Sequence, residues 1–103
     1  TRRRLWAFIG HLRREAQIGL RVFGVSLVRH VHQDAAGKLE VLTARLTAAS
    51  DAGRDVGRYA AGARMVRQQL AAARDASGKG RPVVALVQAA HALDLVTRIS
   101  AAF

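Results

Sequence analysis

The chain has 103 residues, the size of one domain with a modest core, so a multidomain enzyme is excluded. Half of the residues are hydrophobic, too many for a disordered chain, and the absence of cysteine excludes disulfides and thiolate metal sites. The formal net charge is +10, and 15 of the 17 basic residues are arginine against seven acids. Such a surface favours polyanionic partners, either nucleic acid or anionic lipid headgroups.

The two most apolar stretches, 18–31 and 83–96, are each interrupted by polar residues. Neither reaches the roughly 18–20 clean apolar residues that a bilayer-spanning helix needs, so we expect no membrane span. The chain starts at Thr1 and stops at Phe103 within a helical pattern. We therefore expect a region excised from a longer protein.

The first predicted helix covers about residues 2–33. Its apolar positions recur at steps of three and four, as one face of an α-helix requires: Leu5, Ile9, Leu12, Ala16, Leu20, Phe23, Leu27 and Val31. Arg3, Arg14 and Arg21 form a basic stripe on another side. The pattern breaks at 33–37, where Gly37 suits a left-handed helix end and Asp34 suits a cap.

The second predicted helix covers about residues 38–75 with a near-heptad rhythm of apolar and small residues. Small residues lie four apart at its centre, at Ala49, Gly53, Gly57 and Ala61. Two interior glycines cost roughly 1 kcal/mol each relative to alanine. We therefore expect a kink or a division near Gly53–Gly57.

The third predicted helix covers about residues 82–103, with Pro82 in its first turn. It is apolar on nearly all sides, so we expect it to be the most buried of the three. No segment alternates with the period of a strand. The predicted fold is all-α, an antiparallel bundle of three helical segments forming a single domain over 1–103.

No constellation of residues indicates catalysis. The four histidines do not share a face that could hold a metal, and the acids are scattered, with no nucleophile beside a base. Gly78-Lys79-Gly80 lacks the spacing of a phosphate-binding loop. We expect no enzyme activity, no cofactor and no metal site.

The arginines of the second predicted helix indicate a binding surface. On one continuous helix Arg45, Arg67 and Arg74 project within ~40° of one another, Arg54 and Arg58 form an i,i+4 pair, and Arg64 lies between these groups. They accompany the apolar residues Leu42, Leu46, Val56 and Tyr59. This combination is typical of a helix in a membrane interface. Periodicity leaves open whether the apolar face meets lipid or the other two helices.

The order of motifs resembles the peroxin-eleven family of peroxisomal membrane-elongation proteins. Four pieces carry the resemblance: Arg14-Glu15 with Phe23 and Leu27-Val28-Arg29-His30; Ala36-Gly37-Lys38; Leu42, Leu46, Ser50, Gly53-Arg54 and Arg58; and the run from His91 to Arg98. Together they cover about residues 13–99. The bilayer-spanning segments that family members carry further along are absent from this sequence.

The resemblance implies a protein of the peroxisomal or glycosomal membrane, with this domain exposed to the cytosol. An amphipathic helix would enter one leaflet, curve it and elongate the organelle before fission. It implies lipid-headgroup contacts for Arg54 and Arg58, to which the arginine pattern adds Arg45, Arg64 and Arg67. It implies an inserting face of Leu42, Leu46, Val56 and Tyr59. The implied partners are anionic lipids, further copies of the chain, and a dynamin-type GTPase with its adaptor.

Two alternatives stay open at the level of sequence. A basic helical subunit that binds nucleic acid or joins a large assembly would carry the same charge, although Trp6, Tyr59 and the three phenylalanines form no visible stacking platform. A purely structural interaction module is the other alternative.

Overall fold

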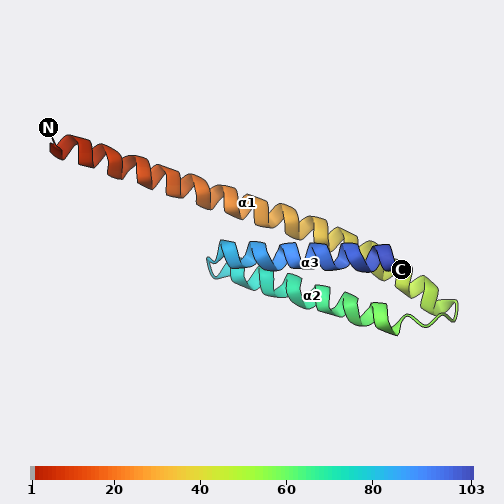
Figure 1. The fold of residues 1–103 in the computed structure, drawn as a ribbon. Coiled ribbons are helices and arrows are strands. Elements are labelled where there is room, and N and C mark those ends of the chain that lie inside the picture. The colour runs from red at the N-terminus through yellow and green to blue at the C-terminus, as the bar shows by residue number, and fades with distance from the viewer. Residues whose placement is uncertain (1) are drawn as a thin grey trace.

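The computed structural model describes the backbone from Arg2 to Phe103 and the side chains from Ser26 to Phe103. Over this range the chain forms three helices and no strand: α1 (Arg2–Asp51), α2 (Gly57–Gly78) and α3 (Pro82–Ala102). α2 runs back along the second half of α1, and α3 returns and packs against both (Figure 1). The prediction of an all-α antiparallel bundle of three helical segments is confirmed.

Both turns between helices are built on a glycine with a left-handed backbone, Gly53 at φ 83° and Gly80 at φ 72°. At the end of α1, Gly53 N–H donates to the Ser50 carbonyl (2.9 Å) and Arg54 N–H donates to the Ala49 carbonyl (3.0 Å). This pair of bonds satisfies carbonyls that the helix end leaves unpaired. The predicted division near Gly53–Gly57 is therefore confirmed.

The start of α2 is held by a side chain. The Oδ1 atom of Asp55 accepts a hydrogen bond from Gly57 N–H at 3.0 Å, the local arrangement by which aspartate favours turns. The chain thus leaves α1 and enters α2 within five residues. The helix predicted over 38–75 is in fact the last part of α1 followed by α2.

The predicted break at 33–37 is wrong, because α1 runs through it without interruption. Gly37 takes no positive φ, and it lies between Ala35 and Leu39, both buried in the core. Packing on both sides of the glycine outweighs its helix penalty of about 1 kcal/mol. The sequence signal at Gly37 was real but too weak to end a helix that tertiary contacts hold.

The core is built largely from alanine. Among the described side chains, eight of the fifteen buried hydrophobic residues are alanines, and α3 contributes Ala85, Ala89 and Ala92 together with Val96. These four lie at steps of four, three and four, so they form one narrow seam. A Cβ atom on Gly62 of α2 would lie 2.6 Å from Cδ1 of Ile99 on α3, so these two helices approach closely.

α1 is about twice as long as its partners. Its 50 residues span roughly 75 Å, whereas the 22 residues of α2 and the 21 of α3 span roughly 33 Å. A small buried cluster of Val28, Ala76 and Ala85 marks where the α2–α3 turn meets α1. Residues 2–27, which we call the free half of α1, run on past this turn (Figure 1). The apolar stripe predicted from Leu5 to Phe23 lies outside the described side chains.

Two alanine substitutions should change stability in opposite directions. Gly37→Ala should raise the free energy of unfolding by about 0.5–1 kcal/mol, because the position is helical with no atom near the added methyl group. Gly53→Ala should lower it by about 1–2 kcal/mol, because φ is positive there. Urea unfolding followed by circular dichroism measures both. A destabilised Gly37→Ala would mean that α1 is broken at that point.

Candidate membrane-interaction surface

The break between α1 and α2 redistributes the predicted headgroup arginines over three elements. Arg45 lies on α1, Arg54 in the turn, and Arg58, Arg64 and Arg67 on α2. The predicted common face of Arg45, Arg67 and Arg74 and the predicted helical pair of Arg54 and Arg58 are therefore wrong, since both assumed one continuous helix. All six side chains are exposed.

The structure instead gathers Arg45 and Arg54 around Phe103. Their guanidinium carbons lie 5.1 and 5.6 Å from the centre of the Phe103 ring, within the range of cation–π attraction. Tyr59 packs edge-on against the same ring, with centroids 5.2 Å apart and planes at 68°. This Phe103 cluster joins the end of α1, the turn, the start of α2 and the end of α3.

Two hydrogen bonds reinforce the Phe103 cluster. Arg45 Nη1 donates to the Ser100 carbonyl and the Tyr59 hydroxyl donates to the Ala102 carbonyl, each at 3.4 Å. Both acceptors belong to the last turn of α3, whose carbonyls have no partner within the helix. The cluster therefore closes this end of the bundle.

The predicted inserting face points into the bundle. Leu42 is fully buried and Leu46 nearly so, while Val56 and Tyr59 are partly buried against the same core. In this conformation lipid cannot reach Leu42 and Leu46, and only part of Val56 and Tyr59 is accessible. The question that periodicity left open is answered for the closed bundle: the face meets the other two helices.

A different apolar surface is exposed, at the start of α3. Val83, Val84 and Val87 keep 73%, 45% and 50% of their surface accessible, so the helix that was predicted to be the most buried still exposes bulky apolar side chains. The physical reason is the alanine seam, because the small residues face the core and the bulky ones face outward. Lys79 and Arg81 of the preceding turn are also exposed, so basic side chains border the valines. We call Lys79, Arg81, Val83, Val84 and Val87 the turn patch.

α3 is also the one helix of the described residues that is long and apolar enough to span a membrane. Only 22% of its most apolar window is buried in the bundle. The sequence prediction of no such segment was based on uninterrupted apolar residues within 83–96. The helix in fact extends to Ala102, and its mean hydropathy is high enough despite the polar residues within it.

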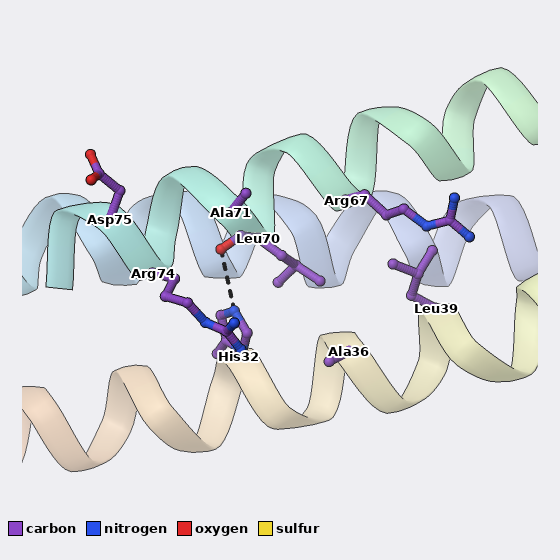
Figure 2. A pocket seen from close by; sticks show the side chains of 8 residues that line it. All are labelled: His32, Ala36, Leu39, Arg67, Leu70, Ala71, Arg74 and Asp75. Atoms are coloured by element: carbon purple, nitrogen blue, oxygen red, sulfur yellow. Dashed lines mark hydrogen bonds between the residues drawn. The ribbon is translucent and has the colours of Figure 1, made fainter. Parts of the chain in front are cut away.

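A groove runs between α1 and α2. Figure 2 shows its central part, lined by His32, Ala36, Leu39, Arg67, Leu70, Ala71, Arg74 and Asp75. His32 Nε2 donates to the Leu70 carbonyl across it at 3.2 Å, which requires the hydrogen on that nitrogen since a carbonyl only accepts. Arg67 Nη2 donates to Thr43 Oγ1 at 3.4 Å. These two contacts tie α1 to α2 on the side that α3 leaves open.

Few of the basic side chains are neutralised. In the described part of the chain the ion pairs are Lys79–Asp75 at 3.0 Å and Arg98–Asp94 at 3.1 Å, both exposed pairs one helical turn apart. Among the same residues no group of three histidines and acids lies close enough to hold a metal ion. The arrangement therefore offers cations and apolar surface for binding.

Comparison with known proteins gives no relative: no family model, no curated protein and no solved structure matches the chain.

Sequence reasoning missed the turn patch and the Phe103 cluster. A usable signal for the turn patch was present in α3, where Ala85, Ala89 and Ala92 follow helical spacing and mark the side that packs closely. The valines fall outside that spacing. The Phe103 cluster has no such signal, because its members come from positions 45, 54, 59 and 103 and meet only in the folded chain.

Replacing Phe103 should test the Phe103 cluster. Phe103→Ala should lower the free energy of unfolding by about 2 kcal/mol, since two exposed cation–π contacts are worth about 0.5–1 kcal/mol each and one aromatic pair a similar amount. Phe103→Leu keeps apolar bulk but no aromatic ring and should lose roughly half as much. Urea unfolding provides the measurement, and an unchanged midpoint for Phe103→Ala would show that the cluster does not hold the bundle end.

Proposed function

We propose that this domain associates with anionic membranes and remodels them, as a member of a peroxin-eleven type system at the peroxisomal or glycosomal surface. The observation that carries the proposal is the turn patch, where exposed valines border two basic residues. Basic side chains attract anionic headgroups, and apolar side chains beside them gain by entering the acyl boundary. The choice of the peroxisomal or glycosomal membrane rests on the motif resemblance.

The charge of the chain supports the same proposal. The net charge of +10 is carried mainly by arginines, and Arg58 and Arg64 are exposed on α2. Each basic residue near an anionic surface is worth on the order of 1 kcal/mol. Charge alone would equally attract nucleic acid, but exposed valines gain nothing on a phosphate backbone. The turn patch therefore favours a membrane.

Remodelling requires a further step, because Leu42 and Leu46 are buried in the closed bundle. We place membrane association first, through the turn patch and the arginines, and insertion of the Leu42, Leu46, Val56 and Tyr59 face second, after the bundle opens. The Phe103 cluster holds the end where Val56 and Tyr59 lie. Opening at this end would expose the face of Leu42, Leu46, Val56 and Tyr59. Self-association and a dynamin-type fission partner belong to the same proposal.

Co-sedimentation with vesicles tests the association. The unmodified chain should bind vesicles that contain phosphatidylserine, and part of the binding should survive high salt because the valines insert. Replacing Val83, Val84 and Val87 together with serine should weaken the salt-resistant part of the binding at least about tenfold. A tenfold change corresponds to about 1.4 kcal/mol, which is less than the roughly 1.5–3 kcal/mol gained by burying one valine. Met65→Ser, at an exposed apolar residue of α2, is the matched control and should bind normally.

A gel shift with DNA and RNA decides between membrane and nucleic acid. Binding to nucleic acid that exceeds binding to vesicles at physiological salt, and falls steeply as salt rises, would overturn the membrane proposal. Vesicle binding that is equal with neutral and anionic lipid would remove the role of the arginines.

Val56→Asn tests whether the face of Leu42, Leu46, Val56 and Tyr59 inserts. Asparagine at this position, the residue before α2, is neutral and caps a helix well, so the fold and the charge are kept. Vesicle binding should change little, whereas tubules should become about tenfold rarer, because the loss of one inserted valine is worth more than 1.4 kcal/mol. Electron microscopy of treated vesicles counts them. Tubules as abundant as with the unmodified chain would mean that Val56 stays in the core.

A further inference from the structure

The backbone of the free half of α1 extends away from α2 and α3, and its sequence has an amphipathic pattern (Figure 1). It projects by about 39 Å beyond the α2–α3 turn (Figure 1). Along it the positions of Leu5, Ile9, Leu12 and Ala16 follow one another at steps of four, three and four and share one face. The positions of Arg3, Arg14 and Arg21 share the opposite side. The sequence pattern therefore gives this half one apolar side and one basic side.

This segment is also the most one-sidedly charged part of the chain. Residues 2–27 contain six arginines and a single acid, Glu15. A second copy of the chain is a poor partner, because pairing would bring like charges together along the whole helix. A nucleic acid would use the arginines and leave the leucines exposed. An anionic bilayer satisfies both, since headgroups meet the arginines and the apolar face enters the acyl boundary.

The position of the free half adds an independent argument. It leaves the bundle at the cluster of Val28, Ala76 and Ala85, the same end at which the turn patch is exposed. The exposed valines and the projecting helix are therefore neighbours at one end of the molecule.

We infer that the free half of α1 is a membrane-inserting element of this protein and lies in the plane of an anionic leaflet, with the turn patch beside it. The inference rests on the proposed membrane association and assigns insertion to residues 2–27, distinct from the face of Leu42, Leu46, Val56 and Tyr59. Because the backbone of this half runs on past α2 and α3, it inserts without opening the bundle (Figure 1). The charge and the apolar face are supplied by the same 26 residues.

The sequence provides a probe for the test, because Trp6 is the single tryptophan of the chain and lies in the free half. With vesicles of phosphatidylcholine and phosphatidylserine, Trp6 emission should move to shorter wavelength and should be quenched by lipids brominated on the acyl chain. Vesicles of phosphatidylcholine alone should cause much less change. An emission shift that needs no lipid and grows with protein concentration would instead show that a second copy covers the helix and would overturn the inference.

A matched pair of double variants separates this element from the rest of the protein. Ile9→Gln with Leu12→Gln should abolish the Trp6 shift and weaken binding at least about tenfold, because two apolar side chains no longer insert. Thermal unfolding of the bundle should stay unchanged. Val41→Gln with Met65→Gln, at exposed apolar residues of the bundle half of α1 and of α2, should leave the Trp6 shift intact.

The outcomes for the inference and for the proposed function are distinguishable. Sedimentation with anionic vesicles without any change in Trp6 emission would leave membrane association standing and overturn insertion of the free half. Absence of sedimentation would overturn both. A Trp6 shift that persists in the Ile9→Gln, Leu12→Gln variant would show that the apolar stripe does not enter the lipid.

Discussion

The close packing of alanine-lined helix faces is the interaction on which the rest of this structure depends. α3 packs against α1 and α2 because the small side chains of Ala85, Ala89 and Ala92 let the helix axes approach. Gly62 of α2 has no side chain that would collide with Ile99 of α3. Small residues gain less from burial than leucine or phenylalanine would. The bundle is therefore held by close alanine contacts together with the leucines and valines of the core, while the valines at the start of α3 stay exposed.

This packing gives the two ends of the bundle different characters. One end is closed by the Phe103 cluster, in which arginine and aromatic side chains tie the turn and all three helices together. The other end carries the turn patch and extends into the free half of α1. Exposed valines and basic residues thus accumulate at the second end. In our proposals that end meets the membrane, and the first controls whether the bundle opens.

The sequence by itself determined the helical class, the division near Gly53–Gly57 and the turn before Pro82, but the break that it predicted at 33–37 does not exist. Gly53 is followed by Asp55, which favours a turn, and Gly80 by Pro82, which favours the start of a helix, so local chemistry and chain reversal agree there. Local signals failed at Gly37, where the same residue type carries no turn. A glycine ends a helix where the packing of the residues on both sides does not outweigh its helix penalty.

Only the tertiary structure decided which side of each helix faces inward. The spacing of Leu42 and Val56 fits a lipid-facing stripe as well as a core. The spacing of the alanines in α3 marks one side suited to close packing, but α3 is apolar on nearly all sides, so spacing alone does not bury the alanines and expose the valines. The Arg45–Arg54–Phe103 contact depends on a chain reversal between distant positions, which no local pattern encodes. The physical reason is common to these cases: burial is a property of pairs of surfaces, and a single helix contains only one of them.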